Sequence, residues 1–176
     1  DGHAVTFENG LVEVDTSEKV MRVHAGARWS DVIATTDPLG LGPRVMQSNN
    51  DFGIAATFCV NAHGWPVKAG PMGSTVRAFE MIMPDGEEVT CSRTENTDLF
   101  AMTMGGYGLT GVLTRMDVDL LPNLRLEPSY AEMPAQDFGT GFVQALADPS
   151  VNMAYGRLSV DRADFMSKAL LITYRP

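Results

Sequence analysis

The sequence has few cysteines, few histidines and no long apolar run, and each shortage excludes a class of protein. Two cysteines, Cys59 and Cys91, in 176 residues cannot form the framework of a disulfide-rich domain. We interpret both as buried free thiols. The three histidines, His3, His24 and His63, stand in unrelated contexts without metal-ligand spacing. No apolar run reaches the length that a transmembrane helix needs.

Positive charge is also scarce. Lysine and arginine total 13 against 22 aspartates and glutamates, a net charge of −9. An acidic surface repels phosphate backbones, so we expect no nucleic acid partner. Neither G-x-S-x-G nor G-x-x-x-x-G-K-[ST] occurs. Arg44 and Lys68 are candidate phosphate contacts, and we interpret both as surface residues. A bound phosphate would therefore be held mainly by backbone N–H groups.

The remaining composition is that of a folded chain, with 44% hydrophobic and 20% charged residues. Its length suits one domain, or one domain and part of another. Alternating runs at 11–14 and 20–24 predict a hairpin. Trp29, Val32 and Ile33 recur at helical spacing and predict a helix over 28–40. The segment between about 44 and 64 is interpreted as two loops around a small apolar run.

The second half of the first 125 residues has stronger signals. Asp85-Gly86 between two apolar runs predicts a hairpin. The segment 94–106 predicts a helix capped by Asn96 or Thr97 and ended by Gly105. The run at 111–121 alternates as a half-buried strand. Its predicted core face is Val112, Thr114, Met116, Val118 and Leu120, and its predicted solvated face is Arg115, Asp117 and Asp119.

The pattern of predicted elements changes after about residue 125. An irregular link at 128–138 precedes a short helix at 142–150 and two strands at 153–160 and 168–175. We place a domain boundary here, with 1–125 as one domain and 126–176 as the beginning of another. Strands and helices do not alternate regularly, so we predict an α+β fold rather than a doubly wound one.

The stretch "GYGLTG" fits G-x-G-x-x-G at Gly106, Gly108 and Gly111. A dinucleotide-binding βαβ unit needs a strand before these glycines and a helix after them. Here the predicted order is reversed. We therefore interpret the glycines as a helix end and a tight turn into a strand. Glycine-rich backbone can still approach a flat ligand closely.

Three segments in order resemble the vanillyl-alcohol oxidase, or p-cresol methylhydroxylase (PCMH), superfamily of FAD-binding proteins. They are "QSNNDFGIAATFCVNAHG", "FEMIMPDGEEVTCSRTENTDLFAMTMGGYGLTG" and "GVLTRMDVDLLPN". With the preceding "MRVHAGARWSDV", the similarity covers roughly residues 10–125. The sugar-lactone and polyol oxidases of the superfamily look most similar.

The resemblance implies an FAD-binding domain of two α+β parts, with a mixed or antiparallel sheet and flanking helices, and a substrate domain beyond it. It implies that the chain contains the second FAD subdomain and the opening of the substrate domain. The first subdomain, with the principal pyrophosphate loop, is expected upstream. The cofactor-binding positions that the resemblance implies are Ser48, Gly53, Ile54, Ala55, Ala56, Val60, Asn61, Ala62, His63 and Leu113.

Each of these positions has a defined expected role. Ser48 meets the cofactor, and the turn at 53–56 cradles the pyrophosphate and ribityl region. The loop at 60–63 lines the flavin largely through its backbone, and the backbone of Leu113 meets the adenosine part. The sequence departs from the family pattern at Ala55 and Ala56, where relatives usually have a Gly-Gly pair. The Cβ atom of each alanine narrows the space through which a phosphate approaches the backbone.

Several alternatives remain open for single residues. His63 is a loop residue that fixes a turn, a flavin contact, or a catalytic base. Asn61 is a turn residue in the left-handed region or a polar flavin contact. Ser48 is a plain turn residue or a cofactor contact. No catalytic residue is assigned.

The resulting prediction is an FAD-dependent oxidoreductase that oxidises a hydroxyl-bearing carbon of a sugar, sugar lactone or polyol by hydride transfer to the flavin. Two alternatives are kept. One is an NADPH-dependent flavin reductase of a nucleotide-linked sugar. The other is a non-catalytic binding or assembly module with a degenerate FAD fold. The electron acceptor, oligomeric state and compartment are not predicted.

Overall fold

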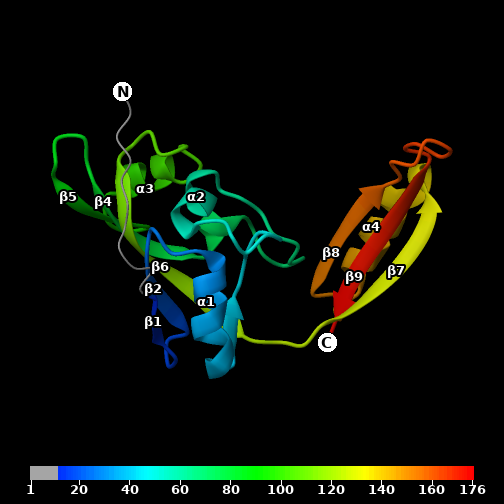
Figure 1. Ribbon diagram of the computed structural model, residues 1–176, viewed down its shortest axis with the longest axis horizontal. Coiled ribbons are helices and arrows are strands. Elements are labelled where there is room, and N and C mark those ends of the chain that lie inside the picture. The colour runs from blue at the N-terminus through cyan, green and yellow to red at the C-terminus, as the bar shows by residue number, and fades with distance from the viewer. Residues whose placement is uncertain (1–11) are drawn as a thin grey trace. The chain divides into compact units, whose positions relative to one another are not determined.

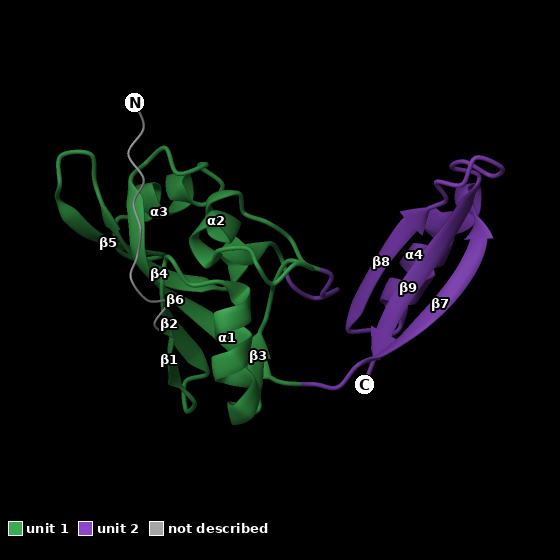
Figure 2. Ribbon diagram, in the orientation of Figure 1, with its two compact units in different colours: residues 1–64, 70–123 green, residues 65–69, 124–176 purple. Residues whose placement is uncertain are grey.

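The structure is a computed structural model that describes residues 12–176. The chain divides into two compact units (Figure 2). Unit 1 comprises the residues up to Gly64 together with Gly70–Asn123, and unit 2 comprises Trp65–Ala69 together with Leu124–Pro176. A short segment in the middle of the unit 1 sequence therefore belongs to unit 2, and no sequence pattern marks it.

Unit 1 is built on a six-stranded antiparallel sheet (Figure 1). The strand order is β1-β2-β6-β4-β5, and β3 pairs with β6. The strands are β1 (Val12–Asp15), β2 (Val20–His24), β3 (Leu41–Pro43), β4 (Val76–Ile82), β5 (Glu88–Ser92) and β6 (Val112–Pro122). Both predicted hairpins are confirmed, as β1-β2 and β4-β5. Leu11, the first residue of the first predicted strand, lies outside the described residues.

Three α-helices complete the core of unit 1. They are α1 (Trp29–Thr36), α2 (Ile54–Cys59) and α3 (Thr97–Thr103), with short 3₁₀ helices η1 (Asp37–Leu39) and η2 (Met72–Ser74). Phe58 on α2, Phe79 on β4 and Phe100 on α3 are buried. The ring of Phe79 lies 5.4 Å, between centroids, from each of the other two. Because aromatic side chains bury large apolar areas, this cluster fastens α2 and α3 to the sheet.

The predicted helices at 28–40 and 94–106 are confirmed, and the structure shows how the first ends and how the second begins. The first continues from α1 into η1 and ends at Gly40, whose φ is 69°. Asn96 occupies the N-cap position of α3, but its side chain does not cap the helix. Its Nδ2 instead donates a 2.7 Å hydrogen bond to the carbonyl of Thr90.

The two loops predicted around the apolar run between 44 and 64 are present, but the turn predicted at 53–56 is wrong. Gly53 is the N-cap of α2, and Ile54–Ala56 form the first turn of that helix. The helix buries Ile54 and Phe58 in the core. At six residues it is too short for apolar periodicity to distinguish it from a loop.

The predicted alternation in β6 holds from Arg115 onward and is wrong before it. A β-bulge interrupts the β4-β6 pairing there and leaves Thr114 without a paired residue on β4. One extra residue reverses the faces of a strand. Leu113 is therefore buried, with 5% of its surface exposed, whereas Val112 is 40% exposed.

Unit 2 is a three-stranded antiparallel sheet in the order β7-β9-β8, with a helix beside it (Figure 1). Its elements are β7 (Glu127–Pro134), η3 (Ala135–Asp137), α4 (Phe138–Ala147), β8 (Met153–Leu158) and β9 (Lys168–Arg175). The last two strands and the helix are confirmed. The predicted irregular link at 128–138 is wrong, because most of it is β7. Its residues are nearly all exposed, so no apolar alternation marks the strand.

The two faces of the unit 2 sheet differ. Gly156 faces α4, since a Cβ at this position would collide with the ring of Phe138. Successive residues of a strand point to opposite faces, so Tyr155 lies on the other face. There the ring of Trp65 stacks on Tyr155 at 4.1 Å between centroids and 16° between planes. Antiparallel sheets with few helices in both units confirm the α+β class.

Candidate functional site

Nine of the ten predicted site residues lie between Ser48 and His63, on α2 and its flanking loops. The start of α1 holds this stretch in place through backbone hydrogen bonds. The N–H of Trp29 donates to the carbonyl of Phe52 (3.1 Å), and the N–H of Ile54 donates to the carbonyl of Ala27 (3.0 Å). The loop that precedes α2 is therefore fixed at its end.

A buried threonine on α2 links this helix to α1 and to the loop that precedes α2. Thr57 is 1% exposed. Its hydroxyl accepts the indole N–H of Trp29 at 3.0 Å and lies 2.8 Å from Oε1 of Gln47 and 2.9 Å from the carbonyl of Gly53. Because buried polar groups cost stability unless they are paired, this network fixes the position of α2. It also holds the loop that carries Ser48, which is itself exposed.

The first turn of α2 presents backbone donors. Among the hydrogen bonds of the described residues, the N–H groups of Ala55 and Ala56 have no acceptor. Ile54 is fully buried and its N–H is already bonded, so it supports this turn from the inside. The methyl group of Ala55 packs against the core of unit 1, while Ala56 is exposed. Only one of the two extra Cβ atoms therefore narrows the approach to these donors.

The loop at 60–63 is fixed by Asn61 and Ala62. Asn61 has a φ of 46°, which confirms the left-handed turn conformation. Its Oδ1 accepts the N–H of Gly73 at 2.9 Å. The N–H of Ala62 donates to the carbonyl of Thr57 (3.0 Å), and its carbonyl accepts the N–H of Met72 (2.8 Å).

His63 has a different environment. It is exposed, and its Nδ1 lies 3.1 Å from the carbonyl of Gly64, its own neighbour in the chain. This contact does not link the loop to another element. The turn-fixing role considered for His63 is therefore performed by Asn61 and Ala62.

The glycine motif is a turn between α3 and β6, which confirms that it is not a βαβ unit. A Cβ at Gly111 would lie 2.6 Å from the carbonyl oxygen of Ile82, and one at Gly106 would collide with the carbonyl of Met102. Gly108 has a φ of 75°. Gly106 and Gly111 therefore allow the chain to pack closely on itself, and Gly108 allows a left-handed turn.

This turn packs against the end of α2. The N–H of Gly105 donates to the carbonyl of Phe58 (3.2 Å), and the N–H of Tyr107 donates to the carbonyl of Cys59 (2.8 Å). The structure thus places the turn at 105–108 against the C-terminal end of α2, immediately before the loop at 60–63. Leu113 lies farther along β6 with its side chain in the core.

The two cysteines are free. Cys91 is buried as predicted, whereas Cys59 is only half-buried, which corrects that prediction. Burial raises the pKa of the Cys59 thiol, and a hydrogen bond with the Gly108 backbone partly opposes this. A thiol with a raised pKa is a poor nucleophile. The raised pKa disfavours a nucleophilic role for Cys59.

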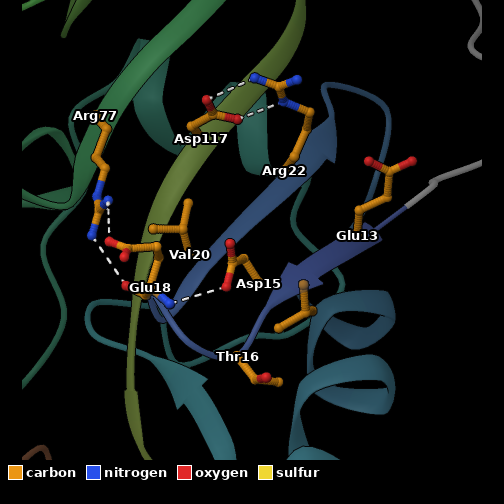
Figure 3. Close-up of a pocket in the computed structure, with 9 residues that line it drawn as sticks. Glu13, Asp15, Thr16, Glu18, Val20, Arg22, Arg77 and Asp117 are labelled. Carbon is orange, nitrogen blue, oxygen red and sulfur yellow. Dashed lines mark hydrogen bonds and ion pairs between the residues drawn. The ribbon is translucent and has the colours of Figure 1, made fainter.

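The largest surface hollow described, of about 660 Å³, lies away from the predicted site, over β1 and β2 (Figure 3). Its charged groups are largely paired with one another. Arg22 binds Asp117 at 2.8 Å, and Arg77 binds Asp119 at 2.7 Å. The two aspartates are thus on the solvent face as predicted, but they are ion-paired and not simply solvated. None of the predicted site residues lines this hollow.

Within residues 12–176, no group of three or more His, Cys, Asp or Glu side chains is arranged to hold a metal ion. In the same part of the chain, no helix has the length and apolar character that crossing a membrane requires.

Comparison with known proteins defines the class. Residues 3–92 match the family described as FAD binding domain, which is half of the chain. The chain therefore belongs to this family, the FAD-binding domains of the vanillyl-alcohol oxidase and PCMH superfamily, and its cofactor is FAD. The family resemblance seen in the sequence is confirmed.

The individual relatives differ in what their names say. Cytokinin dehydrogenase 7 of Oryza sativa subsp. japonica is 33% identical over 125 residues, which is 69% of this chain and 24% of that protein. Alditol oxidase of Streptomyces sp. is 28% identical over 131 residues (73% and 31%). A putative D-arabinono-1,4-lactone oxidase of Neurospora crassa is 27% identical over 123 residues (70% and 22%). The chain spans about a quarter of the length of these curated relatives.

The donor set of this site fits FAD. The unbonded N–H groups of Ala55 and Ala56 can satisfy phosphate oxygens without net positive charge. The loop at 60–63 is held by the hydrogen bonds of Asn61 and Ala62, so it offers a flavin a backbone of fixed conformation next to the exposed imidazole of His63. The Cβ of Ala55, one of the two departures from the family pattern, points into the core and does not obstruct a ligand.

Sequence reasoning missed Arg28. Its backbone forms a bridge with Gly53, which brings a cationic residue beside the first turn of α2. Among the ion pairs of the described residues, none includes Arg28. The cations that the sequence suggested are elsewhere: Arg44 is exposed, and Nζ of Lys68 contacts the carbonyl of Pro149 in unit 2. The pairing of residues 28 and 53 is long-range and has no local signal.

Proposed function

We propose that the full-length protein is an FAD-dependent oxidoreductase that oxidises a hydroxyl-bearing carbon of a sugar, a sugar lactone or a polyol. The alditol oxidase and the putative lactone oxidase among its relatives support this substrate class. Bound FAD would supply the hydride acceptor for this oxidation, while the protein supplies position and electrostatics. In this proposal residues 1–125 belong to the FAD-binding domain and residues 126–176 begin the substrate domain.

Two observations together support the proposal. The chain belongs to an FAD-binding family, and the backbone of the predicted loop at 60–63 is held in place by hydrogen bonds. Gly53, Ala55 and Ala56 present backbone donors to the pyrophosphate and ribityl region, and Ile54 fixes their turn from the core. Ser48, exposed on the loop held by Gln47, is a further contact. The backbone of Leu113 is assigned to the adenosine part.

The loop from Val60 to His63 is assigned to the flavin itself. Its conformation is held by the chain itself, because Asn61 and Ala62 are hydrogen-bonded to η2 and α2. A preorganised loop loses little conformational freedom on binding. The imidazole of His63 is exposed, and within residues 12–176 its one hydrogen bond is to the carbonyl of Gly64, so we assign it a cofactor-lining role and not that of the base.

The substrate class is tested by mixing the full-length holoprotein with candidate reductants in the absence of oxygen. A polyol, a sugar lactone, a cytokinin and NADPH are added separately, and the flavin absorbance near about 450 nm is followed. The proposal predicts bleaching by the polyol or the lactone. Bleaching by the cytokinin alone would overturn the hydroxyl-carbon assignment. Bleaching by NADPH alone would favour a reductase, and a protein that holds no flavin would favour a binding module.

A further inference from the structure

Tyr107 is an aromatic residue that the fold exposes at a conformational cost. It is 76% exposed and has a φ of 54°, in the left-handed region that bulky side chains rarely adopt. Gly105 and Gly108, on either side, also have positive φ values, of 78° and 75°. Among the aromatic and cation–π contacts of the described residues, none involves Tyr107. Packing within the chain therefore does not explain the ring.

The backbone of Tyr107 is fixed against the loop that the family resemblance assigns to the flavin. Its N–H donates to the carbonyl of Cys59, the residue immediately before Val60. Gly105, two residues before Tyr107, lies against Asn61, since a Cβ on Gly105 would be 3.5 Å from the Cβ of Asn61. Asn61 and Tyr107, two of the five non-glycine residues with positive φ in the described chain, therefore lie on two segments that contact each other. Strained backbone conformations of this kind cluster at ligand sites.

Other apolar side chains on these segments are also exposed. Leu109 is 89% exposed, Met102 is 65% exposed and Val60 is 44% exposed. These residues lie on the loop that begins at Val60, on α3 and in the turn after α3, and these segments meet at the end of α2. The ligand indicated by the neighbouring loop is flat and aromatic, because that loop is assigned to a flavin nucleotide.

We propose that Tyr107 is an additional cofactor-contact residue, whose ring packs against one of the two planar rings of FAD. The inference rests on the proposed function, since it places the ligand at the same site. An aromatic ring packs favourably against a flat heterocycle in an offset or edge-on arrangement. In this proposal the left-handed conformation of Tyr107 is retained because it holds the ring in the position that the cofactor requires.

Glycine is the discriminating substitution at this position. Tyr107→Gly removes the ring, and glycine adopts the observed φ without strain. The matched control is Lys19→Gly, which relieves a φ of 53° between β1 and β2, a turn that contains none of the predicted site residues. Tyr107→Phe keeps the ring and removes the hydroxyl. We expect both glycine variants of the apoprotein to melt at or above the wild-type temperature.

The test is the Kd of FAD for the full-length apoprotein, measured by titration. We expect Tyr107→Gly to raise it about tenfold, while Tyr107→Phe and Lys19→Gly stay within about twofold of wild type. A Tyr107→Gly variant that folds and binds FAD as tightly as wild type would overturn the inference. A wild-type protein that binds no FAD would instead overturn the proposed function.

Separate titrations with ADP and FMN identify the ring that Tyr107 meets. A weaker affinity of Tyr107→Gly for ADP places the ring on the adenine. A weaker affinity for FMN places it on the isoalloxazine. Equal affinities of wild type and variant for FAD, ADP and FMN alike would contradict the contact.

Discussion

The two units use the same architecture, an antiparallel sheet packed against helices, but they differ in how much they bury. The hydrophobic core cluster lies wholly in unit 1 and joins the sheet to α1, α2 and α3. In unit 2, α4 has no buried residue. The buried apolar side chains of unit 2 are Val151, Ala154, Ala169, Leu171 and Ile172. Because small cores supply little stability, unit 2 depends on a few contacts, whereas unit 1 can hold a strained loop.

The largest expected effect is a break in the core of unit 1. Phe79→Ala removes the ring between Phe58 and Phe100, and we expect it to lower the free energy of unfolding of unit 1 by about 3–5 kcal/mol. Phe142→Ala on the half-buried face of α4 is the matched control, with an expected loss of about 1–2 kcal/mol in unit 2. Denaturant unfolding with amide exchange assigns each loss to its unit. Equal losses would contradict the contrast between the two cores.

A second experiment tests how much unit 2 depends on the segment 65–69. Trp65 stacks on Tyr155, and the N–H of Val67 donates to the carbonyl of Asn152 at 2.9 Å. We expect Trp65→Ala to destabilise unit 2 by about 2 kcal/mol, because it removes a stacked ring. Amide exchange in β8 and β9 measures this loss, and Trp65→Phe should restore most of it. Unchanged protection in both strands would show that unit 2 does not need this segment.

Two variants at one position separate strain from hydrogen bonding in the loop of unit 1. Asn61→Gly keeps the left-handed conformation and loses the bond from Gly73, so we expect a cost of about 1 kcal/mol. Asn61→Ala also strains the backbone, and we expect about 2 kcal/mol. Thermal unfolding measures both, and FAD affinity should fall in the same order. A glycine variant as unstable as the alanine variant would show that the conformation carries no cost.

The smallest expected effect distinguishes the two alanines that depart from the family pattern. Ala55→Gly removes a methyl group that packs on the core, and we expect it to cost about 1 kcal/mol or more. Ala56→Gly removes an exposed methyl group, costs less, and opens the approach to the N–H donors. We therefore expect Ala56→Gly, and not Ala55→Gly, to bind FAD at least as tightly as wild type. Tighter binding by the Ala55 variant would reverse the assignment.

Much of unit 1 could be predicted because its signals are local. Asp85-Gly86 determines a hairpin within a few residues, and Trp29 with Val32 shows helical spacing over one turn. The order of a helix, glycines and a strand was enough to reject a βαβ unit around Gly108. The family resemblance then supplied the candidate site, which no periodicity or spacing indicates.

The rest could not be predicted because it depends on contacts between distant residues. The bulge at Thr114 arises in the pairing of β6 with β4 and reverses the faces of Val112 and Leu113 without a local pattern. The pairing of Arg28 with Gly53, and the packing of Tyr107 against Cys59, are likewise long-range. The strand β7 was missed because its residues are exposed and so lack apolar alternation.

The most direct test of the account is the visible absorption spectrum of the full-length protein, recorded before and after acid precipitation. The account predicts flavin bands near about 375 and 450 nm, set by the chemistry of the cofactor. Colour that stays with the precipitate would indicate a covalent flavin, and colour released to the supernatant would indicate bound FAD. A colourless protein whose spectrum and melting temperature do not respond to added FAD would contradict the account.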